Sequence, residues 1–400
     1  MAVKFAERTN NMEGSAIREL LKLTQRPEVI SFAGGLPAPE LFPVKEMIEV
    51  SKKVLEESGT SAMQYSTTEG YLPLRKHLAN RMNEKLKTNV GPDDLLITNG
   101  SQQCLDFLGK AFLDKGDVVL CESPSYVGAI NAFNAYQPRF IDVPTDENGM
   151  IMEELEKILA TTDNVKFIYV IPDFQNPSGR TWPLERRKKF MEIINKYEIP
   201  VAEDNPYGEL RFEGEYLPSL KSMDTKGLVM FLGTLSKILC PGYRIGWVAA
   251  SEEILAKFNV IKQAADLQAS TISQMEMAKF FDMYSVDDHV KKIREVYGHR
   301  RTVMMNAIEK YFPKCVKYTH PNGGLFTWVI LPEGIDASKL QKEKALPHNV
   351  AFVPGAPFFP NGGNTNTFRM NYSNMPDDKI EEGIRLLGLA IQEAIDDLEK

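Results

Sequence analysis

The chain has 400 residues, of which 43% are hydrophobic and 25% are charged, and its formal net charge is −7. This composition is typical of a globular protein with room for two or three domains, and the acidic balance argues against a nucleic-acid surface. No apolar stretch approaches the roughly 20 residues that cross a bilayer, and the N-terminus lacks the apolar core of a signal peptide. A cytoplasmic location is therefore expected. The five histidines show no metal-ligand spacing, so no metal site is predicted.

The first fifty residues are predicted to hold one short helix, residues 15–23. A Gly/Pro-rich stretch follows at residues 34–39. Because proline restricts its own backbone and that of the preceding residue, this stretch is expected to form an ordered loop. An amphipathic helix comes next, marked by Leu74, Leu78 and Met82 at helical spacing.

The middle of the chain alternates short Val/Ile-rich runs with helical patterns, which is typical of a layered α/β domain. Few polar residues interrupt these runs, so helices are expected to cover both faces of the sheet. A helix containing Leu184 and Phe190 separates the third run from the fourth. The runs predict strands at 95–98, 118–121, 165–171, 199–202, 228–232 and 245–250.

The C-terminal part has a mixed pattern. A long helix is predicted to begin near Ile293 and to end at Pro313. Two strands, residues 326–331 and 367–372, and a final helix from Asp378 then indicate a smaller α+β domain.

The first motif with chemical character is the segment 233–246, in which Lys237 follows one apolar strand and precedes another. A lysine is usually a solvated surface residue. When it is partly desolvated it loses some preference for the ammonium form, and its neutral amine can attack an aldehyde. Seven residues later, Arg244 offers a planar cation suited to a phosphate. Thr234 and Ser236 add hydroxyl donors.

A second motif joins the predicted strand at 95–98 to a helix. Gly100 and Ser101 open that helix, where unpaired backbone N–H groups and the helix dipole form an anion site. Serine is also an ordinary N-cap, so the motif is weak alone. Together with Arg244 and Ser236 it indicates a phosphate cup.

Further polar residues follow the predicted strands. Asp204 lies at the sheet edge where ligands gather in open α/β folds, and a carboxylate there can keep a pyridine nitrogen protonated. An aspartate of a turn or helix cap is the alternative. Asn176 and Tyr207 could donate to a phenolic oxygen of the same ring. Tyr126 could stack on the ring, or pack in the core.

Arg369 interrupts a segment with strand-like character. An inward-facing arginine needs an anion, and the two N–H bonds of a guanidinium suit a substrate α-carboxylate. A structural salt bridge is the competing interpretation.

In this order, these residues resemble the fold-type I pyridoxal-phosphate aminotransferases over most of the chain. The sequence is most similar to the α-aminoadipate/kynurenine group, through residues 15–24, 31–37, 64–71 and 353–355. The resemblance implies an α/β fold in which a mostly parallel seven-stranded sheet between helices forms a large domain, and both chain ends build a smaller α+β domain. The implied boundaries are 1–30 for a substrate-covering segment, 31–50 with 312–400 for the small domain, 51–290 for the large domain and 291–311 for an interdomain helix.

The resemblance also implies the site. Lys237 would carry pyridoxal 5'-phosphate as a Schiff base and, with Asp204 and Tyr126, would form the catalytic set. The implied cofactor contacts are Tyr65, Gly100, Ser101, Gln102, Tyr126, Asn176, Asp204, Tyr207, Thr234, Ser236, Lys237 and Arg244. The implied substrate contacts are Ser15, Arg18, Gly35, Asn176 and Arg369. Tyr65 would reach the phosphate from a neighbouring subunit, which implies a homodimer.

The expected reaction is amino transfer from an L-α-amino acid, such as 2-aminoadipate, glutamate or an aromatic amino acid, to a 2-oxo acid such as 2-oxoglutarate. Arg18 could pair with a distal carboxylate or stack on an aromatic substrate, or it could be a solvated surface charge. A racemase or β-lyase would share every cofactor contact. A non-catalytic regulatory protein of the same fold is a third alternative.

Overall fold

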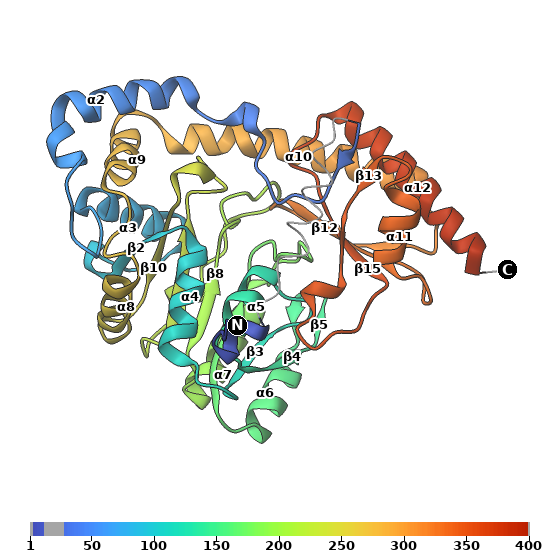
Figure 1. Ribbon diagram of the computed structural model, residues 1–400, viewed down its shortest axis with the longest axis horizontal. Coiled ribbons are helices and arrows are strands. Elements are labelled where there is room, and N and C mark those ends of the chain that lie inside the picture. The colour runs from blue at the N-terminus through green and yellow to red at the C-terminus, as the bar shows by residue number, and fades with distance from the viewer. Residues whose placement is uncertain (1–2, 12–27, 399–400) are drawn as a thin grey trace.

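The computed structural model describes residues 3–11 and 28–398 of the chain (Figure 1). The helix predicted at 15–23, with Ser15 and Arg18, lies outside the described residues. No helix of the described part is both long and apolar enough to cross a membrane.

A seven-stranded sheet forms the centre of the larger part of the molecule, with the strand order β2-β10-β9-β8-β7-β3-β4. Only β10 runs antiparallel to its neighbours, so the expected mostly parallel seven-stranded sheet is confirmed. The strands are β2 Leu95–Asn99, β3 Val118–Glu122, β4 Arg139–Val143, β7 Val165–Val170, β8 Val201–Asp204, β9 Val229–Thr234 and β10 Ile245–Ala249. The sequence did not predict β4, which lies at the sheet edge and fully buries only Phe140 and Val143.

Helices cover both faces of this sheet because its strands bury alternate residues on opposite sides. Val119 and Cys121 of β3 pack with α4, α5 and α8, whereas Val118 and Leu120 pack with α6 and α7. These helices are α4 Ser101–Phe112, α5 Val127–Asn134, α6 Met152–Thr161, α7 Leu184–Tyr197 and α8 Glu252–Ala265. A third cluster packs α2, α3 and α9 against Ile97 and Trp247. Those helices are α2 Val44–Ala62, α3 Leu72–Leu86 and α9 Thr271–Met283.

A four-stranded antiparallel sheet, in the order β11-β12-β15-β14, forms the smaller part. Its strands are β11 Lys317–Tyr318, β12 Phe326–Ile330, β14 Val353–Pro354 and β15 Thr367–Asn371, and helix α12 Asp377–Leu398 packs beside it. Near the N-terminus, β1 Ile30–Ser31 pairs with β13 Val350–Ala351, so both chain ends contribute to this part. Apart from α10 Val286–Tyr311, the described residues also form β5 Thr145–Asp146, β6 Gly149–Met150, α11 Ala337–Leu340, a π-helix Gln341–Ala345, and 3₁₀ turns Glu7–Asn11, Pro39–Leu41, Pro92–Asp94, Lys221–Met223, Pro241–Tyr243 and Ala356–Phe358.

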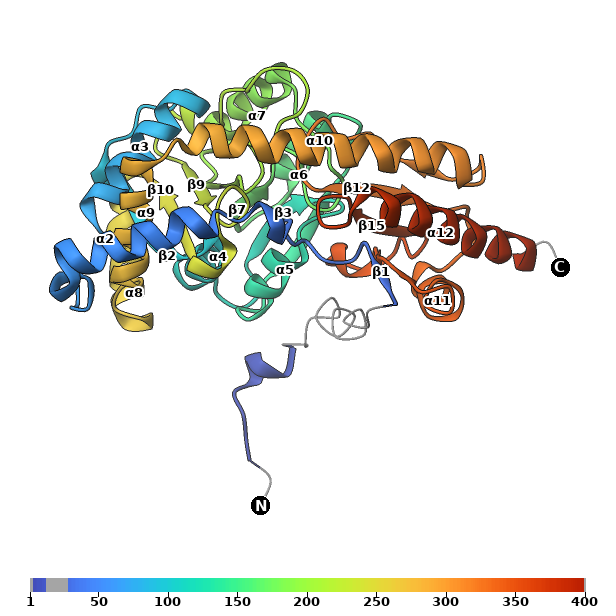
Figure 2. The same ribbon diagram turned by 90° about the horizontal axis from the view of Figure 1, so that it is seen from above.

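The long helix α10, Val286–Tyr311, runs along one side of the molecule from the region of α3 and α9 to α12 (Figure 2). The predicted start near Ile293 is wrong, because Ser285 caps an earlier turn by accepting from the Asp288 backbone N–H. The expectation of a single helix in the first fifty residues is also wrong, since α2 begins at Val44. The predicted domain boundaries at 50/51 and 290/291 fall inside α2 and α10, and the domain division stays a prediction.

Candidate active site

One edge of the large sheet gathers the predicted polar residues. Strands β7, β8 and β9 run parallel and end there, and β2 ends there as well because both β2 and β9 are antiparallel to β10. Asp204 is the last residue of β8, whereas Asn176 and Lys237 lie in the loops that follow β7 and β9. Arg369 comes from β15 of the small sheet, and its Nη1 donates to Asn176 Oδ1 at 2.8 Å. The two sheets therefore meet at this edge.

Lys237 is partly buried, and its Nζ donates to the backbone carbonyl of Gly35 at 2.8 Å. Burial, together with the positive charges of Arg369 and Arg244, lowers the pKa of Lys237 to about 8. An amine with such a pKa is partly neutral near physiological pH, and the neutral form is the nucleophile.

Asp204 is buried and its two carboxylate oxygens have different surroundings. Oδ2 accepts from the Tyr169 hydroxyl at 2.6 Å, whereas Oδ1 is buried without a partner among the described residues. Burial raises the pKa of Asp204 to about 6, and the bond from Tyr169 acts against this rise. The bond to a neighbouring strand does not fit the interpretation of Asp204 as a turn or cap residue. A buried carboxylate oxygen without a partner, such as Asp204 Oδ1, instead favours a bound molecule that donates a hydrogen bond to it.

The predicted phosphate cup is closely packed. Gly100 has φ +73°, and a Cβ there would lie 2.4 Å from Arg244 Nη2. A Cβ on Gly246 would lie 2.5 Å from the backbone nitrogen of Ser101, at the start of α4. Thr234 Oγ1 lies 2.9 Å from Ser236 Oγ. The helix N-terminus, the hydroxyls and the exposed Arg244 guanidinium can thus act on one anion.

Gln102 is also in this region, in the first turn of α4. Its side chain is exposed, and Nε2 donates to the Gly128 carbonyl at 3.0 Å. The side-chain amide is therefore occupied by α5, and only the backbone N–H of Gln102 is positioned like the other donors of the helix N-terminus.

Asn176 and Tyr207 lie together, with Asn176 Nδ2 3.4 Å from the Tyr207 hydroxyl. Both side chains are buried, and burial raises the pKa of Tyr207, which keeps its phenol protonated as a donor. Tyr126 is partly buried at the start of α5 and interacts electrostatically with Tyr207 and Arg369. The three residues thus share one side of the site.

Arg369 is a buried cation. Its Nη2 donates to the Ala33 carbonyl at 2.8 Å, and its guanidinium lies 4.1 Å from the centre of the Phe326 ring. Burial lowers the pKa of Arg369 to about 10, and its Nε has no hydrogen-bond partner among the described residues. No carboxylate of the described chain forms an ion pair with it, so the salt-bridge interpretation lacks a partner. A buried cation with a free N–H favours an anionic ligand.

Three predicted residues remain, and the described structure gives none of them a contact with the residues above. Ser15 and Arg18 lie outside the described residues. Tyr65 is 78% exposed and lies beside a surface hollow of about 370 Å³, which Ser58, Gln64 and Thr271 also line.

The sequence missed two groups of supporting residues. Tyr169, inside a strand-like run, was not separated from ordinary core residues, although it directly contacts Asp204. Asp173 accepts from Arg187 Nη2 at 2.7 Å and from Arg211 Nη2 at 3.2 Å. It thereby holds the loops after β7 and β8, and sequence spacing gives no signal for such a network.

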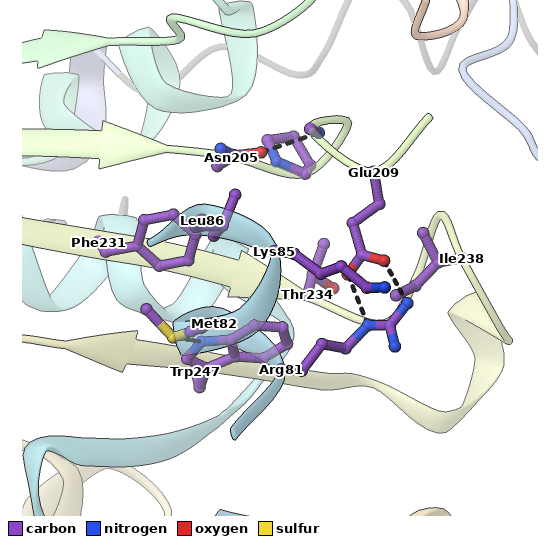
Figure 3. A pocket seen from close by; sticks show the side chains of 12 residues that line it. Arg81, Met82, Lys85, Leu86, Asn205, Glu209, Phe231, Thr234, Ile238 and Trp247 are labelled. Carbon is purple, nitrogen blue, oxygen red and sulfur yellow. Dashed lines mark hydrogen bonds and ion pairs between the residues drawn. The ribbon is translucent and has the colours of Figure 1, made fainter. Parts of the chain in front are cut away.

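A small cavity of about 30 Å³ lies behind the loop that carries Tyr207. Figure 3 shows Arg81 of α3 pointing toward Glu209 of this loop, and Arg81 Nε donates to Glu209 Oε1 at 2.8 Å. Asn205 Oδ1 accepts from the Gly208 backbone N–H at 2.8 Å. The cavity has room for little more than a water molecule, so it is too small for a substrate. The hydrogen bonds beside it hold the loop in place.

Comparisons with known proteins match nearly the whole chain to aminotransferases. Residues 28–387 match the family model of aminotransferase class I and II. The chain is 45% identical to aromatic-amino-acid aminotransferase 1 of Thermococcus litoralis, covering 97% of this chain and 94% of that protein. It is 44% identical to 2-aminoadipate transaminase of Thermus thermophilus, covering 97% and 96%.

Solved structures give the same result. A multiple substrate aminotransferase from Thermococcus profundus superimposes with a TM-score of 0.94 at 43% identity, covering 98% of both chains. An α-aminoadipate aminotransferase from Thermus thermophilus, in complex with N-(5'-phosphopyridoxyl)-L-leucine, superimposes with a TM-score of 0.91 at 42% identity, also covering 98% of both chains.

Proposed function

The chain belongs to the class I and II aminotransferases, and we propose that Lys237 binds its cofactor covalently and moves the proton during amino transfer. The cofactor of the enzyme is pyridoxal 5'-phosphate. Its substrates are an amino acid and a 2-oxo acid. The single observation that carries the proposal is the partly buried Lys237 amine, with a pKa of about 8, in a site that also holds a free carboxylate oxygen of Asp204.

The residues present fit the cofactor. Asp204 Oδ1 lacks a partner and can accept from a protonated ring nitrogen. Asn176 and Tyr207 offer N–H and O–H donors for the phenolic oxygen. Gly100, Ser101, Gln102, Thr234, Ser236 and Arg244 would hold the phosphate, and Tyr126 would stack on the ring. When bound, pyridoxal 5'-phosphate supplies an aldehyde that captures amines and a ring that withdraws electrons from the substrate Cα.

Lys237 performs the proton transfer in this proposal. Its Nζ would hold the cofactor at its aldehyde carbon, with the aldehyde oxygen released as water, until the amino group of the substrate takes that place and frees the lysine amine. The freed amine then takes the proton from Cα and delivers it to the former aldehyde carbon, because a base with a pKa near the working pH is suited to both steps. The Gly35 carbonyl, 2.8 Å from Nζ, provides an acceptor that holds the amine near the site.

Arg369 orients the substrate. Its free Nε and the remaining guanidinium N–H bonds would bind the α-carboxylate of the amino acid. Asn176 Oδ1 accepts from Nη1 and the Ala33 carbonyl accepts from Nη2, so the guanidinium is fixed before substrate arrives. A fixed carboxylate lets the Cα–H bond stand perpendicular to the cofactor ring.

We also propose a homodimer in which Tyr65 of one subunit reaches the phosphate of the other. Helix α2 and the turn after it expose several large apolar side chains, among them Val44, Ile48, Leu55, Met63 and Tyr65. An apolar surface of this kind suits a partner surface. The cytoplasmic location stays a prediction.

For the amino donor, we propose 2-aminoadipate and aromatic amino acids, with 2-oxoglutarate as acceptor. The names of two relatives, an aromatic-amino-acid aminotransferase and a 2-aminoadipate transaminase, support this choice. Arg18, proposed to meet the substrate side chain, lies outside the described residues.

The test is to mix the enzyme with one L-amino acid in the absence of any 2-oxo acid and to follow the cofactor absorbance. The proposed reaction converts the cofactor to its pyridoxamine form, and the Lys237→Ala variant does not. A control variant at exposed Lys226 behaves like the wild type. Formation of the D-amino acid would instead identify a racemase, and cofactor that never responds to donors would identify a non-catalytic protein. Full turnover by Lys237→Ala would contradict the assignment of this lysine.

A further inference from the structure

Tyr169 is placed against Asp204 by the register of the large sheet. Tyr169 of β7 pairs with Ala202 of β8, and Asp204 lies two residues further along β8. Both side chains therefore face the same side of the sheet. The Tyr169 hydroxyl donates to Asp204 Oδ2 at 2.6 Å, and Tyr169 is 1% exposed.

The surroundings leave Tyr169 as the principal stabiliser of the Asp204 charge. Among the described residues, no cation pairs with this carboxylate. The other titratable groups that act on the pair are Cys104 of α4, Tyr126 before α5, and Tyr207 after β8. None of these is a cation, and burial alone favours the protonated acid. Burial and the nearby carboxylate also raise the pKa of Tyr169 well above its ordinary value, so its phenol stays a donor.

We propose that Tyr169 is a positioning residue that fixes Asp204 and keeps the shared proton on the cofactor ring nitrogen rather than on the carboxylate. The inference rests on the proposed pairing of Asp204 with that nitrogen. By occupying Oδ2, the phenol leaves Oδ1 as the oxygen that faces the ring. By donating to the ionised carboxylate, it lowers the proton affinity of Asp204 relative to the pyridine nitrogen.

A Tyr169→Phe variant separates this effect from packing. The ring makes an edge contact with Phe133 at a centroid distance of 5.7 Å, and phenylalanine retains this contact while removing the hydroxyl. A hydrogen bond to a charged group shifts a pKa by about one to two units. Asp204 in the variant is therefore a stronger base by that amount, and the proton moves from the ring nitrogen toward the carboxylate.

The matched control is Tyr136→Phe. The Tyr136 hydroxyl donates to Asp106 Oδ1 at 2.7 Å, so the control removes a comparable tyrosine–aspartate bond away from the sheet edge that holds the site. Wild type and both variants are reconstituted with pyridoxal 5'-phosphate labelled with ¹⁵N in the ring. The ¹⁵N chemical shift of the bound cofactor at neutral pH reports how protonated the nitrogen is, and absorbance gives cofactor affinity.

The expected result is a ring nitrogen that shifts toward the unprotonated value in Tyr169→Phe only, together with at least tenfold weaker cofactor binding. A wild-type ¹⁵N shift in a folded Tyr169→Phe holoenzyme would overturn the inference. Should that variant fail to fold, 3-fluorotyrosine at position 169 provides the second test. Its more acidic phenol must raise the pH at which the ring nitrogen loses its proton, followed by the ¹⁵N shift across a pH series, and an unchanged or lower pH would also overturn the inference. The proposed function fails separately, if wild-type cofactor shows no response to amino donors.

Discussion

Replacing Arg369 with methionine separates its binding of substrate from its effect on folding. The guanidinium is buried between the Phe326 and Phe358 rings, and two of its N–H groups already donate to Asn176 Oδ1 and the Ala33 carbonyl. A substrate carboxylate would take two of the remaining N–H groups. Charge-assisted bonds contribute about 1.5–3 kcal/mol each, so their loss costs ~3–6 kcal/mol, which lowers kcat/KM by roughly 10²–10⁴-fold.

The free energy of unfolding should respond to Arg369→Met less than kcat/KM does. The pKa of Arg369 is lowered by burial to about 10, so its charged form is disfavoured by about 3 kcal/mol relative to water, and this destabilisation is fully present at all pH values below 10. Removing the charge relieves it, whereas the two lost hydrogen bonds, which are also made by a charged group, cost about 1.5–3 kcal/mol each. We therefore expect the free energy of unfolding of the substrate-free protein to fall by no more than about 3 kcal/mol.

The assay compares L-phenylalanine with 2-phenylethylamine, which lacks the carboxylate, in single-turnover conversion of the cofactor. Arg369→Met should lose its rate on the amino acid and keep most of its low rate on the amine. The control is Arg301→Met, because Arg301 is also buried but donates to Glu213 and to the Pro321 carbonyl. It should lose stability without discriminating between the two donors. Equal losses on both donors by Arg369→Met would refute the assignment of this arginine to the carboxylate.

Three further predictions concern the cofactor site. Asp204→Asn should abolish amino transfer but stabilise the cofactor-free protein by about 2–3 kcal/mol in urea unfolding above pH 6. The stabilisation arises because the folded-state pKa of Asp204, about 6, lies above the ordinary value. It should shrink as the pH falls toward 4, where the wild-type carboxylate is protonated. Gly100→Ala should weaken cofactor binding at least tenfold by fluorescence titration, since its Cβ would lie 2.4 Å from a guanidinium nitrogen, whereas Gly59→Ala, with open space around its Cβ, should bind normally. Mixing inactive Tyr65→Ala and Lys237→Ala subunits should restore activity, because one site of each hybrid dimer holds both intact residues; no restoration after subunit exchange would count against a tyrosine supplied by the partner.

The sequence was most informative where a residue type conflicts with its surroundings. A lysine, an aspartate and an arginine at the ends or in the middle of apolar strands each require a partner, and the structure brings Lys237, Asp204 and Arg369 to one sheet edge. Six strands of the large sheet were located from their apolar runs, because strands buried on both faces contain few polar residues.

The remainder depends on contacts that spacing does not encode. Two of the five residues of strand β4 are polar, as suits its place at the sheet edge, and the start of α10 is set by a serine cap rather than by apolar spacing. Tyr169 contacts Asp204 through strand register, and the bond joins residues 35 positions apart. The sequence around a tyrosine in a Val/Ile run is the same whether its ring only packs in the core or its hydroxyl also donates a hydrogen bond. The acceptor can therefore be identified only from the three-dimensional structure.

The role of Lys237 can be read from the covalent attachment site of the cofactor. Reduction of the holoenzyme with borohydride, followed by proteolysis and mass spectrometry, identifies the lysine that carries the phosphopyridoxyl group. We expect the label on Lys237 alone, with labelling of the apoenzyme by added cofactor rising with pH through about 8. A label on any other lysine, with Lys237 unmodified, would contradict this role.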